Sequence, residues 1–109
     1  MQFYKDYLEE LHEGKSLVNN KTGWASYWIR DKECYIEDIY VIPKYRRSRA
    51  AHKLADKVVE IAKKHGCDHL TGTVVPSANN STISLQMMLS YGFKLALSQD
   101  NIIWFKKNI

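Results

Sequence analysis

The sequence has few cysteines and no long apolar run. Its 109 residues include only Cys34 and Cys67, which do not form a Cys-x-x-Cys pair, so we expect neither structural zinc nor any other metal. Both thiols are expected to be free and buried, as in a reducing compartment. No apolar run approaches the roughly 20 residues that cross a bilayer. The first residues lack the order of a secretion signal, so we expect a cytoplasmic protein without a membrane span.

Glycine-rich phosphate loops are missing as well. The five glycines form neither Gly-x-x-x-x-Gly-Lys-[Ser/Thr] nor Gly-x-Gly-x-x-Gly, which argues against the usual nucleotide loops. No serine or cysteine stands in a recognisable nucleophile elbow. The four histidines show no spacing that gathers them, so each is expected to be an ordinary residue.

The composition is that of one folded domain. Hydrophobic residues make up 45% of the chain and charged residues 26%, which is ordinary for a globular protein. The length suffices for one two-layer core, so we expect a single domain over residues 1–109. The net charge of +4 favours anionic partners, such as phosphate-bearing cofactors, nucleic acid or acidic surfaces, without choosing among them.

Hydrophobic periodicity predicts the order of helices and strands. The predicted helices cover residues 3–13, 48–65 and 81–91. The predicted strands cover residues 17–18, 24–29, 33–42, 69–75, 93–97 and 102–106. Ser48 is the expected N-cap of the longest helix. This order predicts an α/β (α+β) domain in which helices pack on a mixed sheet, with a parallel strand pair on either side of that helix.

Four cations lie in a six-residue turn between a strand and the longest helix. They are Lys44, Arg46, Arg47 and Arg49. Helix N-termini bind anions through free amides, and cations placed there are unfavourable unless an anion offsets them. The functional interpretation is a site for a phosphate-bearing ligand, and the alternative is a solvated basic turn. A nucleic-acid-binding domain is a weaker hypothesis, because the cations gather at one turn rather than along a face.

Two carboxylates, Glu37 and Asp38, precede this turn on the same strand. Strict alternation predicts one face with Tyr35, Glu37, Ile39 and Val41 and another with Ile36, Asp38, Tyr40 and Ile42. A carboxylate among aromatic neighbours should have a raised pKa and serve as a general base. The alternative is a pair of charges at a sheet edge, or an ion pair with Arg30 or Lys32.

Two motifs resemble one family. Residues 41–51 read Val-Ile-Pro-Lys-Tyr-Arg-Arg-Ser-Arg-Ala-Ala, which resembles the acetyl-CoA signature of the GNAT superfamily of N-acetyltransferases. The preceding strand looks especially like the diamine and polyamine acetyltransferases of that family. Residues 81–93 are similar to the family's second motif, a helix that ends in Gly92-Phe93. The resemblance covers the chain from about Thr22 to its end.

The resemblance implies a GNAT-like fold and an acetyl-CoA site. The sheet would be mixed and mostly antiparallel, with a splayed central parallel pair, helices on both faces and a shortened N-terminus. Acetyl-CoA would enter the splay, with its pantetheine along the first strand and its pyrophosphate on the basic turn. The residues implied to bind it are Ile39, Tyr40, Val41, Arg46, Arg47, Ser48, Arg49, Ala50, Ala51, Asn80 and Ser81.

The family mechanism implied here is direct attack of a neutral amine on the thioester. Glu37 would accept the amine's proton, and a tyrosine would protonate the leaving thiolate. Because Met88 stands at the family's tyrosine position and cannot donate a proton, the general acid is either missing or supplied by Tyr91 or by solvent. The acceptor would be a small-molecule or peptide amine, and a homodimer is expected from the exposed closing hairpin. Arg49 replaces the signature glycine, so a non-catalytic binding or regulatory module of the same fold is the alternative.

Overall fold

The structure, a computed structural model, describes residues 15–75 and 81–109. The expected helix over residues 3–13 therefore lies outside the described residues. Of the part that is described, no helix is both long and apolar enough to cross a membrane.

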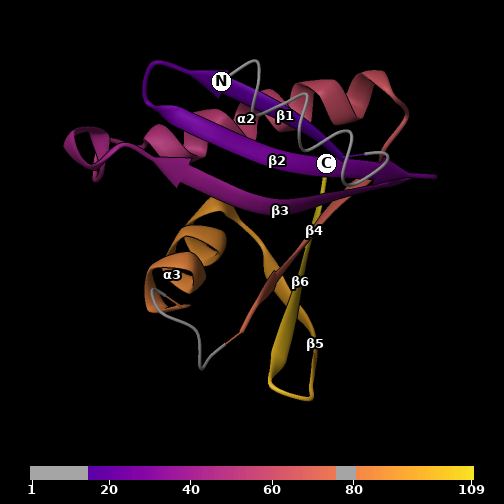
Figure 1. The fold of residues 1–109 in the computed structure, drawn as a ribbon. Coiled ribbons are helices and arrows are strands. Elements are labelled where there is room, and N and C mark those ends of the chain that lie inside the picture. Colours follow the sequence, from indigo (N-terminus) through magenta and orange to yellow (C-terminus); the bar gives the residue numbers. More distant parts are fainter. Residues whose placement is uncertain (1–14, 76–80) are drawn as a thin grey trace.

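In the described residues, six strands and two α-helices form a mixed sheet with the helices packed on it (Figure 1). They are β1 (Lys15–Asn20), β2 (Gly23–Arg30), β3 (Glu33–Val41), α2 (Ala50–Lys64), β4 (His69–Val74), α3 (Ser81–Tyr91), β5 (Lys94–Gln99) and β6 (Ile102–Asn108), and a short 3-10 helix, η1, covers Pro43–Tyr45. The strand order is β1-β2-β3-β4-β6-β5. Among the described strands, β3 and β4 run parallel, and the other neighbouring pairs are antiparallel. The predicted mixed, mostly antiparallel sheet with a central parallel pair is confirmed.

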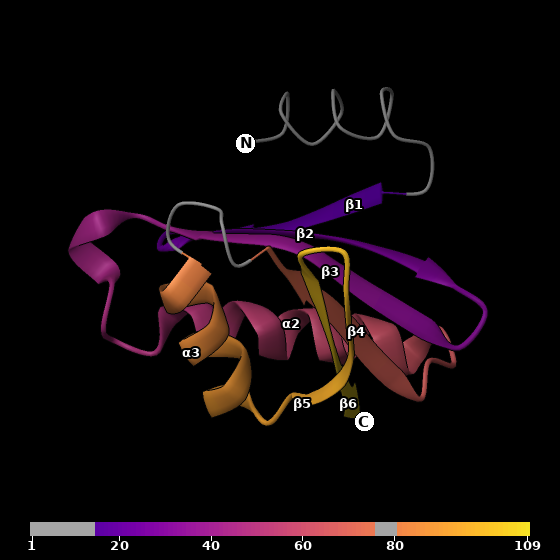
Figure 2. The same cartoon turned by 90° about the horizontal axis from the view of Figure 1, so that it is seen from below.

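Both described helices contribute to one core. The buried residues of α2 recur at helical spacing and are Ala50, Leu54, Ala55, Val58 and Ala62. The same core cluster contains Cys34 of β3, Leu70 of β4, Met88 of α3 and Phe105 of β6. Figure 2 shows α2 and α3 on the same side of β1, β2 and β3. A helix on the opposite side stays an expectation, because the first predicted helix lies outside the described residues.

The start of α2 differs from the sequence expectation. Its N-cap is Arg49, in the left-handed region with φ 65° and ψ 18°, and no side chain caps the helix. The Ser48 hydroxyl instead donates to the carbonyl of Tyr45 in the preceding turn. Ser48 is therefore not the N-cap, because its side chain is used one turn earlier, and the first amides of α2 have no side-chain acceptor.

The first strand is longer than the predicted 17–18. β1 pairs with β2 over six residues, from Lys15 opposite Trp28 to Asn20 opposite Gly23. Because β1 extends to Asn20 and β2 begins at Gly23, the turn between them is short. The Asn20 side chain accepts a hydrogen bond from the Thr22 amide at 2.7 Å within this turn. The other strands and α3 lie within a few residues of their predicted bounds.

Candidate functional site

The two parallel strands diverge in the middle of the sheet. β3 pairs with β4 only from Glu33 to Tyr35, opposite His69 to Thr71. β3 then continues to Val41 and β4 to Val74 without pairing to each other, and Figure 1 shows their ends pointing apart. Backbone groups on the facing edges beyond this point are therefore available to a ligand.

A β-bulge at Glu37 sits where the strands separate. Ser26 of β2 lies opposite Asp38, whereas the next residue, Tyr27, lies opposite Ile36. Glu37 is thus the extra residue on β3, and a bulge bends its strand and increases the local twist. The bulge accounts for the divergence of β3 from β4.

The bulge also reverses the predicted alternation of β3. Ile36 is buried in the core and Ile39 packs against it. Tyr35 instead stacks on Trp28 with ring centroids 5.0 Å apart, and Tyr40 stacks on Trp24 at 5.9 Å. The sequence expectation was therefore wrong: Tyr35 does not share a face with Ile39, because one inserted residue shifts the two-residue period.

The two candidate bases differ in their surroundings. Glu37 and Asp38 are both exposed residues next to the opening. Although Asp38 is exposed as a residue, neighbouring groups partly desolvate its carboxyl and raise its pKa; a hydrogen bond from the Ile39 amide lowers the pKa, and the neighbouring Glu37 charge raises it. Asp38 therefore holds a proton to higher pH than an ordinary aspartate.

The basic turn is held against the end of β3 by Arg46. Its Nε donates to the carbonyl of Val41 at 3.0 Å, and its guanidinium lies 5.8 Å from the centre of the Tyr40 ring. The Arg46 amide donates to the carbonyl of Pro43 at 3.2 Å. Arg46 thus makes structural contacts through both its side chain and its amide, so its amide hydrogen is already used within the turn.

Arginines 47 and 49 have left-handed backbone conformations. Their φ angles are 66° and 65°, in a region that strongly favours glycine. Both side chains are exposed, as is that of Ser48, and α2 has no acidic residue in its first turn. The turn therefore presents amides and positive charge together at the start of a helix, an arrangement suited to an anion.

The second motif is described only in part. Asn80 lies outside the described residues, and Ser81 is the first residue of α3. Met88 is buried, and a Cβ placed on Gly72 of β4 would lie 2.5 Å from the Met88 Cε atom. Glycine at position 72 thus makes room for the methionine beside the diverging strand.

Tyr91 interacts with α2. Its hydroxyl donates to the Asp56 carboxylate at 2.6 Å, and the Lys107 ammonium lies 5.5 Å from its ring centre. Burial raises the pKa of Tyr91, and the bond to Asp56 raises it further. The expected role of Tyr91 as proton donor stays a prediction, and this raised pKa makes the hydroxyl a weaker acid.

Two contacts at the opening were missed in the sequence. The Tyr35 hydroxyl and Thr73 Oγ1 lie 2.8 Å apart, and the Thr71 hydroxyl donates to Glu33 at 2.7 Å. Both join β3 to β4 across 38 positions of sequence, so no local pattern could reveal them. They fix the point from which the opening begins.

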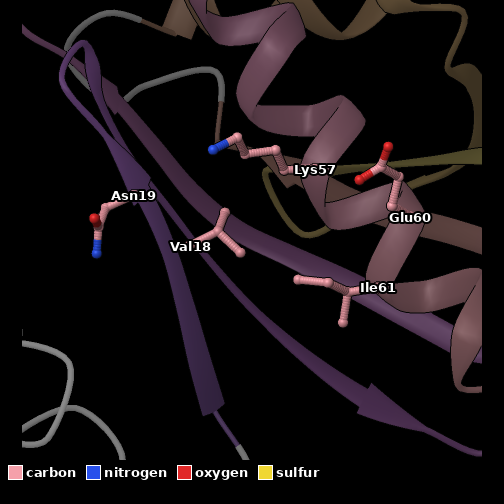
Figure 3. A pocket seen from close by; sticks show the side chains of 5 residues that line it. All are labelled: Val18, Asn19, Lys57, Glu60 and Ile61. Atoms are coloured by element: carbon pink, nitrogen blue, oxygen red, sulfur yellow. The ribbon is translucent and has the colours of Figure 1, made fainter.

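The described residues contain no candidate metal cluster. Within residues 15–75 and 81–109 there is no group of three or more His, Cys, Asp or Glu side chains that could hold a metal. A hollow of about 360 Å³ lies between β1 and α2, where Val18 and Ile61 approach each other below Lys57 (Figure 3). It shares no residue with the predicted site.

Comparison with known proteins decides the family. The profile of the Acetyltransferase (GNAT) family matches residues 3–89. The chain belongs to the GNAT acetyltransferase family. It is 35% identical over 75 residues to aminoglycoside N(6')-acetyltransferase type 1 of Acinetobacter genomosp. 13, covering 69% of this chain and 47% of that protein. It is 30% identical over 81 residues to thialysine N-epsilon-acetyltransferase of Mus musculus, covering 70% of this chain and 47% of that protein. This GNAT domain thus spans about half the length of these relatives.

Solved structures of the family share the fold. The paiA N-acetyltransferase of Thermoplasma acidophilum, solved in complex with coenzyme A, has a TM-score of 0.78 at 13% identity, covering 99% of this chain and 69% of that one. A GNAT acetyltransferase of Elizabethkingia anophelis with acetyl-CoA bound has a TM-score of 0.71 at 18% identity, covering 96% and 83%. At these identities the likeness concerns the fold.

Proposed function

We propose that this GNAT domain binds acetyl-CoA and transfers its acetyl group to a primary amine. The observation that carries the proposal is the divergence of β3 from β4 at the Glu37 bulge, directly before the basic turn. Support also comes from the family, two fold neighbours of which were solved with coenzyme A or acetyl-CoA. The two buried free thiols fit a reducing compartment, so we place the activity in the cytoplasm.

The cofactor would bind along two parts of the opening. Its pantetheine would pair with backbone groups of Ile39, Tyr40 and Val41 on the edge of β3 that faces away from β2, apart from the Val41 carbonyl, which already accepts a hydrogen bond from Arg46 Nε. Its pyrophosphate would accept hydrogen bonds from the amides of residues 47–51, where the helix dipole adds to the positive charge of Arg47 and Arg49. The Arg46 amide is left out of this set because Pro43 already accepts its hydrogen.

The proposed reaction forms an amide bond and breaks a thioester. The neutral amine nitrogen attacks the acetyl carbon, the carbon–sulfur bond breaks, and the sulfur leaves as the thiolate of coenzyme A. Glu37 accepts the proton that the nitrogen loses, directly or through water. The thiolate takes a proton from solvent or from Tyr91.

Glu37 is the preferred base because of its place at the bulge, where the thioester would lie. Asp38 is its neighbour, but it is paired in register with the buried Ser26 of β2. The acceptor would be a cationic amine of small-molecule or peptide origin. The exposed carboxylates of Glu37 and Asp38 beside the opening offer such a cation opposite charge.

Kinetics of two isosteric variants test the assignment. Thiol release from acetyl-CoA is measured over a panel of amines and peptides for the wild type, Glu37→Gln and Asp38→Asn. We expect Glu37→Gln to lower kcat by about 100-fold or more, the usual contribution of a general base. Asp38→Asn should change it much less. Equal activity of Glu37→Gln and the wild type would remove Glu37 from the mechanism.

A binding module without transfer is the second candidate. It is favoured by Met88, which cannot donate a proton, and by the Tyr91 hydroxyl, which is already bound to Asp56. This candidate predicts that acetyl-CoA binds while no amine in the panel releases its thiol.

A further inference from the structure

A row of three aromatic rings crosses the sheet on the face opposite its core. Tyr27 of β2 and Ile36 of β3 belong to the core, so the next residue on one strand and the preceding residue on the other, Trp28 and Tyr35, lie on the other face. Their rings stack with centroids 5.0 Å apart, and the ring of Trp104 on β6 follows at 6.4 Å from Tyr35. These three rings are called the aromatic row below.

The aromatic row reaches the opening between β3 and β4. The Tyr35 hydroxyl lies 2.8 Å from Thr73 Oγ1 of β4, and Trp104 is directly opposite Thr73 on β6. Tyr35 is also the last residue of β3 that pairs with β4. The rings of Tyr35 and Trp104 therefore converge over β4 at the point where the strands begin to separate.

The two carboxylates at the opening share this face. Glu37 and Asp38 lie between Ile36 and Ile39, which both face the core, and Asp38 is paired in register with Ser26, two residues from Trp28 on β2. Glu37 follows Tyr35 by two residues, which is roughly 7 Å along a strand. An amine held by these carboxylates would therefore have the aromatic row beside it.

The end of the row carries exposed apolar surface. Trp104 is 38% exposed, and Leu97 of β5, directly opposite Trp104, is 52% exposed. The rest of the row is less available, because the Arg30 guanidinium lies 5.6 Å from the centre of the Trp28 ring and Tyr35 is stacked on the other side of that ring. A ligand would thus meet Trp104 and Leu97 rather than the inner rings.

The charges beyond the row are mainly positive. Lys106 is opposite Thr71 of β4 and directly opposite Lys94 of β5, so two cations adjoin the apolar end of the row, and Arg30 adjoins its other end. Glu33 also lies here, but its carboxylate accepts a hydrogen bond from the Thr71 hydroxyl at 2.7 Å. A second ammonium group on a ligand would therefore meet like charges, whereas an uncharged apolar group would not.

We propose that the apolar end of the aromatic row is an acceptor subsite that selects arylalkylamines over polyamines. The amino group would lie at Glu37 and Asp38, and the aromatic body of the same molecule would lie against Trp104 and Leu97. Trp104 is then the residue that determines specificity. The inference rests on the proposed function, because it names the class of amine that accepts the acetyl group.

Three amines of matched length test this selectivity. Thiol release from acetyl-CoA is measured with butylamine, 4-phenylbutylamine and 1,4-diaminobutane, which differ only in the group that follows the fourth carbon. We expect kcat/KM to be about tenfold higher for 4-phenylbutylamine than for butylamine, because the phenyl ring gains an aromatic contact and is removed from water. The diamine should be the poorest substrate, since its far ammonium approaches Lys94 and Lys106.

Variants locate the selectivity within the site. Trp104→Ala should bring the kcat/KM ratio of 4-phenylbutylamine to butylamine close to one, mainly through KM. Leu97→Ala keeps the tryptophan and should lower the ratio by a smaller factor, so it serves as the test if Trp104→Ala does not fold. Leu89→Ala is the matched control, because Leu89 is 53% exposed but lies on α3 outside the row, and it should leave the ratio unchanged. Lys106→Gln should raise kcat/KM for the diamine relative to butylamine.

A binding measurement separates this inference from the proposed function. The indole N–H signal of Trp104, identified by its loss in Trp104→Phe, is followed by NMR while 4-phenylbutylamine is added. A saturating shift without turnover of any amine would refute the transfer reaction and support the subsite. An unmoved Trp104 signal would overturn the subsite. Turnover that does not favour the phenyl amine, or a preference that Trp104→Ala and Leu89→Ala change equally, would also overturn it.

Discussion

Replacing Arg49 by glycine should stabilise the fold. Arg49 has φ 65° at the N-cap of α2, and its side chain makes no capping bond. A non-glycine residue in the left-handed region destabilises the folded state by about 1–2 kcal/mol. Glycine removes this strain, but its greater conformational freedom in the unfolded chain offsets part of the stabilisation. We therefore expect Arg49→Gly to raise the free energy of unfolding by about 1 kcal/mol, or the Tm by about 4–8 °C.

Arg49→Ala is the matched control for this prediction. It removes the same guanidinium but keeps the cost of the left-handed backbone, so urea unfolding should show no comparable gain for alanine. If glycine and alanine have equal effects, or if glycine destabilises, the left-handed conformation at residue 49 is refuted. The two variants also separate the effect of backbone strain from the effect of the Arg49 charge on ligand binding. Both variants lose the guanidinium, but only Arg49→Gly relieves the left-handed backbone.

Three further predictions concern titratable groups. Burial raises the pKa of the Cys34 thiol to about 12, and the charges of Cys67 and Glu33 add to the shift. Cys34 should therefore resist alkylation in the native protein and react once urea unfolds it. Rapid labelling of the native protein would contradict this burial. Tyr91→Phe removes the hydrogen bond to Asp56 that joins α3 to α2, and it should lower the free energy of unfolding in urea by about 1 kcal/mol. Its kcat should fall little if solvent protonates the thiolate, whereas a large loss of kcat would support Tyr91 as the proton donor. The pKa of Asp38 is raised above its usual 3.8, so its contribution to stability is full below that pH and is lost as the pH rises through the folded pKa. The unfolding midpoint of the wild type should therefore fall as the pH rises through this range, and Asp38→Asn should remove that fall. A pH profile that Asp38→Asn leaves unchanged would exclude Asp38 as its source.

The sequence predicted the elements well because their signals are local. Helix α3 has its predicted bounds, and α2 follows an apolar stripe with Leu54 and Val58 on its buried face. The basic turn was also visible, since its four cations are adjacent in sequence. Local periodicity and charge are thus enough to place the strands along the chain and to find the turn.

The details of the site depended on contacts that no local pattern contains. The bulge at Glu37 inserts one residue into an otherwise regular period, so strict alternation placed Tyr35 and Ile39 on the same face. Tyr91 meets Asp56 across 35 positions, and this contact changes its acidity. Ser48 was a good N-cap by residue type, yet its hydroxyl bonds to Tyr45 because the turn before α2 is left-handed at Arg47 and Arg49.

The most direct test of the central claim is an NMR titration with acetyl-CoA. The amide signals of residues 39–41 and 47–51 should shift together and saturate at one cofactor per chain. The amide of Arg46, which is bonded to Pro43, should shift less than those that follow it. Absence of any shift at millimolar acetyl-CoA, or shifts confined to other strands, would contradict the assignment of the β3–β4 opening as the cofactor site.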